Sequence, residues 1–126
     1  MSNKSISDML MEFHLATGCD SLSLRDWAEL RKKLLREELD ELCEAIDSFD
    51  PEQIAKEGSD LVYVVFGTMQ RPQIRLEVAI EEVHKSNMSK IGPDGKFVER
   101  EDGKVLKGPN YRPPDLSKAL TKSVMV

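Results

Sequence analysis

Two short stretches of the sequence concentrate acidic side chains at helical spacing. The first runs from Glu37 to Glu41, and the second runs from Glu57 to Asp60. Residues three apart lie on one face of a helix, so Glu38 can act together with Glu41, and Glu57 with Asp60. Carboxylates gathered in this way must be protonated, paired with Lys or Arg, or bound to cations, because an unpaired buried carboxylate is very costly.

Glu38 points toward the apolar side of its expected helix. At about 100° per residue, four apolar residues fall within about 40° of it: Leu34, Leu42, Ala45 and Phe49. On the same measure Glu41 lies about 60° away, at the edge of this apolar stripe, and Glu37 lies about 100° away on the same side. A solvated row of charges would lie opposite the apolar residues, so at least Glu38 is aimed at the interior.

A cation site accounts for these acids better than the neighbouring basic residues do. Arg36 and Lys56 are too few, and they flank the acids rather than lie among them. Ligand sets made of oxygen favour Mg²⁺ or Mn²⁺ over Zn²⁺. Because Mg²⁺ usually takes one or two carboxylates and completes its shell with water and phosphate, so many acids indicate more than one ion and a phosphate-bearing substrate. The alternative is an ordinary charged helix face with i, i+4 ion pairs.

Four helices are expected to position these acids, all between residues 5 and 90. Apolar periodicity and capping residues place them at roughly 5–17, 24–49, 51–69 and 72–88. Gly18 should end the first helix, Ser23 should cap the second, and Asp50-Pro51 should open the third.

The apolar run 61–66 directly follows the second group of acids. Its Val, Tyr and Phe would also suit a buried strand. No second strand of similar strength exists to pair with it, so we expect a fully buried helix. Gly58 and Gly67 would weaken this helix, which indicates close helix packing or the approach of a ligand.

The last third of the chain has a different composition. Residues 91–126 hold four of the six prolines and four of the seven glycines. Within them, residues 96–100 and 104–107 flank Glu101-Asp102-Gly103, which is typical of a hairpin. The expected fold is therefore an all-α four-helix bundle, a single domain over residues 1–126, with a short C-terminal β-hairpin and an extended tail.

Composition narrows the class of protein. The chain has 126 residues and a net charge of −5, so duplex nucleic acid is not expected as a partner. The longest apolar run is far shorter than the ~20 residues of a membrane-spanning helix, so no membrane partner is expected. Cys19 and Cys43 form neither a disulfide framework nor a zinc ribbon, and they indicate reduced thiols in a cytoplasmic protein.

The two acid motifs resemble the signature of the all-α nucleoside triphosphate pyrophosphohydrolases. That superfamily includes MazG, dimeric dUTPases and phosphoribosyl-ATP pyrophosphohydrolase. The rest of the chain resembles a MazG-like, dimeric dUTPase-like branch in three segments, at residues 13–14, 82–90 and 102–109. The resemblance covers nearly the whole chain and is weakest over residues 117–126.

This resemblance implies Mg²⁺-dependent cleavage of a nucleotide between its α and β phosphates, with Mn²⁺ as a substitute. The implied metal ligands are Glu38, Glu41, Glu57 and Asp60. Glu37 would orient or deprotonate the attacking water. Pyrimidine deoxynucleotides such as dUTP or dCTP are the first expected substrates, in nucleotide-pool house-cleaning, and family members form a homodimer or a dimer of dimers.

Four further residues are candidates for substrate binding. Asn87 and Lys90 would contact phosphates, although Lys90 could instead complement the dipole at the end of its helix. Phe13 and His14 could stack on a base and donate a hydrogen bond to it, or form a partly buried structural pair.

Two other functions stay open. In phosphoribosyl-ATP pyrophosphohydrolases a His is expected at the position of Val64, and the extension at residues 91–115 is foreign to that branch. These differences make phosphoribosyl-ATP the second choice of substrate. The remaining alternative is a non-catalytic helical dimer that acts as an interaction module, although all five motif acids are present.

Overall fold

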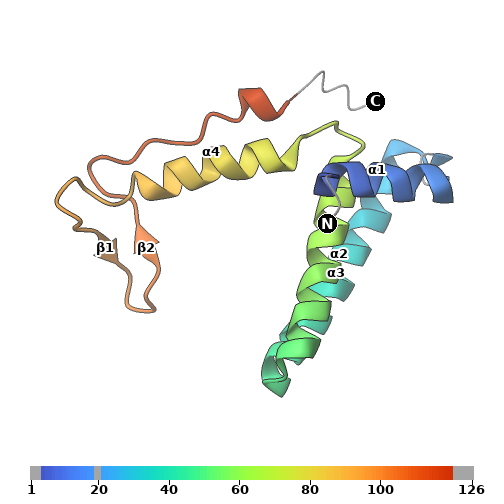
Figure 1. Ribbon diagram of the computed structural model, residues 1–126, viewed down its shortest axis with the longest axis horizontal. Coiled ribbons are helices and arrows are strands. Elements are labelled where there is room, and N and C mark those ends of the chain that lie inside the picture. The colour runs from blue at the N-terminus through green and yellow to red at the C-terminus, as the bar shows by residue number, and fades with distance from the viewer. Residues whose placement is uncertain (1–3, 19–20, 121–126) are drawn as a thin grey trace. The chain divides into compact units, whose positions relative to one another are not determined.

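The computed structural model describes residues 4–18 and 21–120, and these form four helices and one small hairpin (Figure 1). The helices are α1 (Ile6–Thr17), α2 (Leu24–Ser48), α3 (Pro51–Met69) and α4 (Leu76–Met88). Strands β1 (Val98–Glu99) and β2 (Val105–Leu106) are followed by the 3₁₀ helix η2 (Ser117–Ala119). The expected all-α fold with a C-terminal hairpin is confirmed. Cys19 and the end of the expected tail, 121–126, lie outside the described residues.

Local sequence signals explain where the first three helices begin and end. The hydroxyl of Ser23 accepts a hydrogen bond from the backbone N–H of Asp26, which caps α2. Asp50 caps α3 in the same way by accepting from the N–H of Glu52, and Pro51 follows it. Gly18 ends α1 in the left-handed conformation, with φ of 66°. These three expectations are confirmed.

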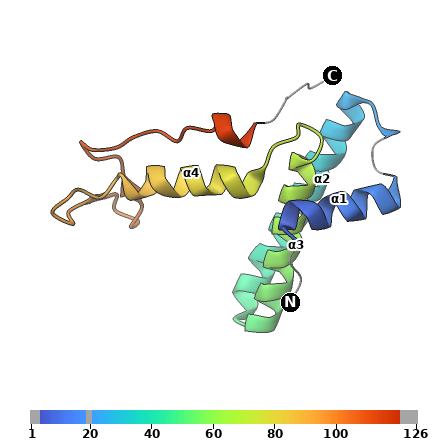
Figure 2. The same ribbon diagram turned by 45° about the horizontal axis from the view of Figure 1, so that its top comes forward.

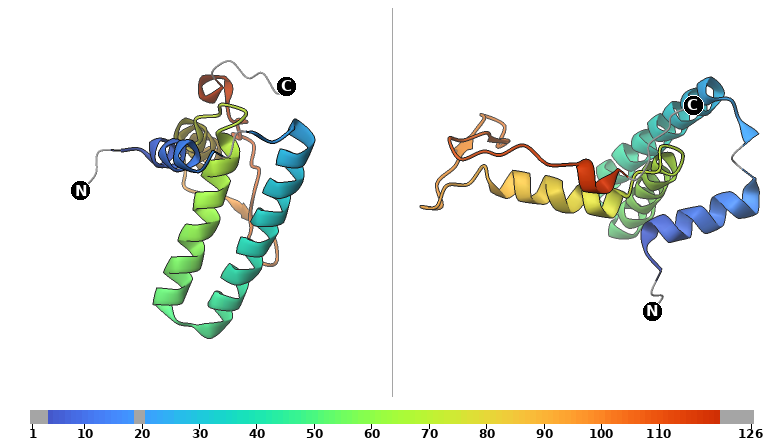
Figure 3. Two further views of the ribbon diagram at one scale, coloured as in Figure 1. Left: turned by 90° about the vertical axis from the view of Figure 1, so that its right-hand side faces the viewer. Right: turned by 90° about the horizontal axis from the view of Figure 1, so that it is seen from above.

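The described residues fall into two compact units, of which the first extends to Ile74. In this unit α2 and α3 lie side by side and antiparallel, joined by a tight connection at Phe49–Asp50 (Figure 3). Helix α1 packs against α3 (Figure 2). The buried apolar residues of this unit are few, and they are Leu10, Ala45 and Phe66.

The apolar run at residues 61–66 is helical, as expected, but it is not fully buried in one chain. Phe66 is buried at 4% exposure, whereas Val62 and Tyr63 are 46% and 38% exposed. This surface is therefore open in a single chain, and full burial of the helix stays a prediction for the oligomer. The reason is that within this unit α3 is covered only by α1 and α2, which leaves part of its surface open.

The second unit begins at Arg75 and contains α4, the hairpin and η2. The segment that ends in η2 runs back along α4, where the N–H of Arg75 donates to the carbonyl of Ala119 at 2.9 Å (Figure 3). In the hairpin, Val98 pairs with Leu106, and Gly103 in the turn has φ of 91°. The hairpin expected over 96–107 is confirmed, with shorter strands.

The expected start of the fourth helix at residue 72 is wrong. Residues 71–73 form a turn in which Gln73 adopts a positive φ of 57°, and α4 begins only at Leu76. A left-handed residue interrupts the helical hydrogen-bond pattern, although the apolar spacing continues through it. No helix among the described residues has the length and apolar character to cross a membrane.

Candidate metal centre

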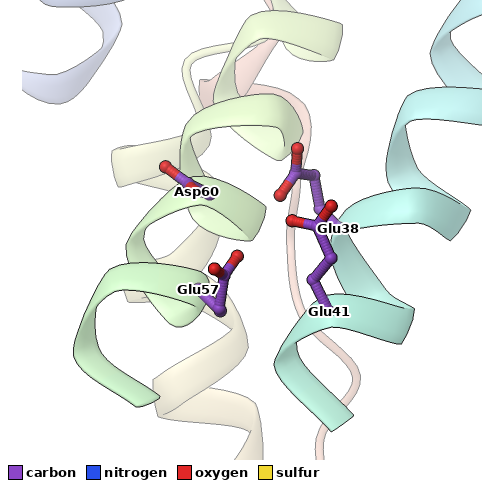
Figure 4. A group of neighbouring side chains, drawn as sticks. All are labelled: Glu38, Glu41, Glu57 and Asp60. Carbon is purple, nitrogen blue, oxygen red and sulfur yellow. The ribbon is translucent and has the colours of Figure 1, made fainter. Parts of the chain in front are cut away.

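Four carboxylates from two helices meet across the α2–α3 interface. Glu38 and Glu41 extend from α2, and Glu57 and Asp60 extend from the facing turns of α3 (Figure 4). One oxygen from each of these four side chains lies within 4.8 Å of the corresponding oxygen of the other three. The spacing of three residues on each helix places both members of each pair on the shared face. The structure thus brings together the four residues that the sequence analysis selected as ligands.

Two oxygen atoms in this group are buried without a partner. Oε2 of Glu38 and Oε2 of Glu57 are shielded from solvent, and neither takes part in a hydrogen bond. Buried polar atoms of folded proteins nearly always have a partner, and leaving a carboxylate oxygen without one is costly. A pair of such atoms facing one another across two helices is the arrangement that a cation would satisfy.

Lys56 neutralises part of the negative charge of this group. Its ammonium donates to Oδ2 of Asp60 at 2.8 Å and to Oε1 of Glu57 at 3.3 Å. Glu57 therefore directs one oxygen outward to Lys56 and keeps the other buried and unpaired. Asp60, and then Glu57, hold the pKa of Lys56 well above its usual range. The expectation that Lys56 only flanks the acids is corrected, and the signal that could have revealed it is its i, i+4 spacing to Asp60.

The remaining acids still repel one another. The pKa of Glu41 is raised above its usual value, first because only its protonated form can donate a hydrogen bond to the carboxylate of Glu57 and then because of the negative charge of Glu38. A raised carboxyl pKa means that the folded protein favours the proton over the bare charge at this position. A cation at this position would relieve the same repulsion.

The donor set fits a hard divalent cation. All four groups offer carboxylate oxygens, and no His or Cys side chain belongs to the group. Mg²⁺ and Mn²⁺ take such oxygen ligands, whereas Zn²⁺ prefers nitrogen and sulfur. Glu37 lies next to Glu38 on α2 with an exposed side chain, and it does not belong to the group of four.

The aromatic candidates in α1 lie in the same unit. Phe13 is about half exposed, and its ring meets that of Tyr63 edge to face at a centroid distance of 5.7 Å. His14 is half-buried and lines a cavity of about 500 Å³, together with Trp27 and Arg31. Both side chains have protein contacts of their own, and their role toward a base stays a prediction.

Asn87 and Lys90 lie in the second unit. Asn87 is exposed near the end of α4, and its carbonyl accepts from the N–H of Lys90 at 3.1 Å. Lys90 is half-buried just beyond α4 and lines a cavity of about 440 Å³ beside Phe97 and Gly108. Their contact with phosphates stays a prediction.

Sequence reasoning missed Arg31 altogether. This side chain is only 8% exposed, and it contacts α3 through Val64 and Thr68. The signal that could have found it is its place on the apolar side of α2, seven residues before Glu38, where a charged residue needs a partner. Gly67 is explained by the same contact, because an added Cβ would lie 2.8 Å from the Arg31 guanidinium.

An all-α fold with Glu-x-x-Glu and Glu-x-x-Asp facing each other belongs to the class of nucleotide pyrophosphohydrolases that the sequence resembles. Comparison with protein families is more specific. Residues 20–87, which are 68 of the 126 residues, match the phosphoribosyl-ATP pyrophosphohydrolase family, and the chain belongs to that family. The match includes α2, α3 and all four clustered acids. Among curated proteins, none matches the chain.

Proposed function

We propose that this protein is a divalent-cation-dependent pyrophosphohydrolase that cleaves a nucleotide between its α and β phosphates. The products would be a nucleoside monophosphate, or its phosphoribosyl derivative, and pyrophosphate. Family membership supports the reaction class. The observation that carries the proposal is the pair of buried, unpartnered oxygens of Glu38 and Glu57, within a group of four acids.

Glu38, Glu41, Glu57 and Asp60 would hold the cation, and Mg²⁺ is the ion that we propose, with Mn²⁺ as a substitute. When bound, such an ion neutralises triphosphate charge, acidifies water and stabilises the leaving pyrophosphate. The helices supply the rigidity that this chemistry needs, since each ligand pair is fixed on consecutive turns of one helix. Lys56 would limit the net negative charge of the group before the ion binds.

Glu37 is the proposed base. It is adjacent in sequence to Glu38, and its exposed side chain leaves it free to reach a water at the edge of the acid group. Its role would be to accept the proton of the water that attacks the phosphorus, which a carboxylate beside a cation-bound substrate can do. Replacing Glu37 with Gln should therefore lower kcat by about 10²-fold or more while cation binding persists.

Two substrates are candidates, and a specific observation favours each. The family match favours phosphoribosyl-ATP. The resemblance to dimeric dUTPases favours a deoxynucleoside triphosphate such as dUTP or dCTP, and Val64, at the position where a His is expected in phosphoribosyl-ATP enzymes, counts against phosphoribosyl-ATP. We propose that the acid group recognises the triphosphate. The remaining part of the nucleotide would then determine which of the two substrates is cleaved.

A panel of substrates tests the reaction and the specificity together. Purified protein would be incubated with phosphoribosyl-ATP and with all common NTPs and dNTPs in Mg²⁺, and pyrophosphate and orthophosphate would be measured separately. Pyrophosphate release by the wild type, lost in Glu38→Gln and kept in Glu44→Gln, is the expected result. Glu44 is the matched control because it is an exposed acid of α2 outside the group of four. Absence of pyrophosphate from every substrate, in Mg²⁺ and in Mn²⁺, would contradict the proposal.

We also propose that the working form is a homodimer or a dimer of dimers. Several large apolar side chains of the first unit are exposed in a single chain, among them Val62 and Tyr63 of α3. Covering such side chains stabilises a protein by roughly 25 cal/mol per Å² of apolar surface removed from water. A monomeric mass by analytical ultracentrifugation at micromolar concentration would refute this.

With a nucleotide as substrate, we propose that the protein acts in the cytoplasm, and we expect neither a membrane nor duplex nucleic acid as a partner.

A further inference from the structure

Arg31 joins α2 to α3 through hydrogen bonds to two residues of α3. Its Nε donates to Oγ1 of Thr68 at 3.0 Å, and its Nη2 donates to the carbonyl of Val64 at 2.9 Å. Oγ1 of Thr68 donates to the same carbonyl at 2.8 Å. The guanidinium, the hydroxyl and the carbonyl thus form a triangle of hydrogen bonds, which we call the Arg31 clamp.

A glycine of α3 provides the space that the Arg31 guanidinium occupies. Gly67 is buried, and a Cβ added there would lie 2.8 Å from Nη2 of Arg31 and 3.2 Å from the ring of His14. Only glycine allows the charged group to approach the helix backbone this closely. The contact is therefore specific, since a glycine and two hydrogen bonds of α3 together define the position of the Arg31 side chain.

On α2 Arg31 lies about two helical turns from the nearest acid, and on α3 Val64 lies about one turn from Asp60, on the same face. Arg31 precedes Glu38 by seven residues, and Val64 follows Glu57 by seven. Seven residues make nearly two complete turns and advance about 10 Å along a helix. The connection at Phe49–Asp50 lies beyond the acids in the other direction. The four carboxylates therefore occupy the stretch of α2 and α3 between the connection and the clamp.

In this stretch, repulsion between side chains opposes the contact between α2 and α3. Its carboxylates repel one another, which drives the helices apart when no cation is bound. Among the described residues, and with the four acids ionised, the side-chain hydrogen bonds that join α2 to α3 come from Arg31. We infer that Arg31 is a positioning residue, which fixes the register of α2 against α3 so that the four acids can share a cation. This inference rests on the proposed function.

Positioning and charge predict opposite effects when Arg31 is replaced. A positive charge about 10 Å from a cation site weakens cation binding, so its removal alone should tighten binding slightly. Loss of register should weaken binding, because the oxygens contributed by α2 and α3 no longer meet. A role in stability alone should change the unfolding temperature and leave the affinity of the folded protein unchanged.

The test measures Mn²⁺ affinity by electron paramagnetic resonance of the free ion, at a temperature where circular dichroism shows each variant to be folded. We expect Arg31→Met to bind Mn²⁺ at least about tenfold more weakly than the wild type, at the lower end of the loss seen when groups that orient metal ligands are removed. Lys33→Met is the matched control, because Lys33 is an exposed cation of the same helix. It should bind as tightly as the wild type or slightly more tightly.

A second variant keeps the test decisive if Arg31→Met does not fold. Thr68→Val keeps the shape of the side chain and removes the hydroxyl that Nε of Arg31 contacts. We expect it to weaken Mn²⁺ binding about threefold or more. If the wild type binds Mn²⁺ and the folded clamp variants bind it equally well, the inference is overturned and the proposed function stands. If the wild type itself binds no Mn²⁺, the proposed function fails, and the inference fails with it.

Discussion

Replacing Glu38 with Gln should stabilise the metal-free protein and abolish its response to Mg²⁺. The substitution keeps the size of the side chain and removes one negative charge from a group whose oxygens lie within 4.8 Å of one another. Two unit charges at that separation repel by about 3.5 kcal/mol at an effective dielectric constant of about 20. Lys56 beside Glu57 offsets part of this repulsion, and salt screens another part. We therefore expect a gain of about 1–2 kcal/mol, or a rise in Tm of about 3–8 °C.

Mg²⁺ should raise the Tm of the wild type and leave the Tm of Glu38→Gln unchanged. At a free ion concentration about 100 times the Kd, binding stabilises the wild type by about 2.7 kcal/mol. Glu38→Gln loses one ligand and the buried unpaired oxygen that makes the site favourable, so its Tm should stay unchanged. Thermal melts followed by circular dichroism, in EDTA and in MgCl₂ at matched ionic strength and protein concentration, measure both effects.

The pH dependence of the same melts supplies a further check. Glu41 has a raised pKa in the folded state, so folding favours its proton, and this contribution to stability is lost as the pH rises through that pKa. In EDTA the wild type should therefore gain Tm as the pH falls from 7 toward 5, relative to Glu38→Gln. The charge of Glu38 is one cause of the raised pKa, and its removal should flatten the profile. A variant that melts below the wild type in EDTA and still responds to Mg²⁺ would refute the reasoning.

Two further substitutions test the interface around the acids. Lys56→Met removes the cation that pairs with Asp60, so the metal-free protein should melt at the same temperature or slightly lower, because exposed ion pairs contribute little. Mn²⁺ should bind more tightly to this variant in titrations; weaker binding would count against Lys56 as a competitor of the ion. Gly67→Ala should cost about 1–3 kcal/mol in urea unfolding because its Cβ would collide with Arg31. Gly58→Ala is the matched control, since its Cβ would make one ordinary contact at 3.9 Å, and it should stabilise α3 by about 0.5–1 kcal/mol; equal effects at the two glycines would contradict the packing described.

The sequence was most informative where structure depends on neighbouring residues. The caps at Ser23 and Asp50 and the stop at Gly18 follow from hydrogen bonds within a few residues, and all three were predicted correctly. The start of α4 was not, because the apolar rhythm continues through Gln73 while its backbone adopts a positive φ. Periodicity reports which face a residue would occupy in a helix, and it does not detect a single residue that breaks the helix.

The acid group could be predicted from the sequence because it combines two local patterns, one on each helix, that a short connection brings together. Each pair is set by a spacing of three residues, and the short connection at Phe49–Asp50 forces α2 and α3 to face one another. Contacts that depend on the packing of two helices could not be anticipated in the same way. The Arg31 clamp is one of these, since its partners lie 33 and 37 residues away in the sequence.

The small core and the repulsion between the acids both weaken the contact between α2 and α3. Each chain buries few apolar side chains, and α3 leaves Val62 and Tyr63 exposed, so little apolar packing is available to hold the interface closed against carboxylate repulsion. A clamp at one end and a tight connection at the other limit the opening of the helices, and a cation removes the repulsion between them. With the proposed cation, binding the ion would favour closing α2 against α3 and closing would favour binding, so a substitution that only loosens the clamp should weaken cation binding.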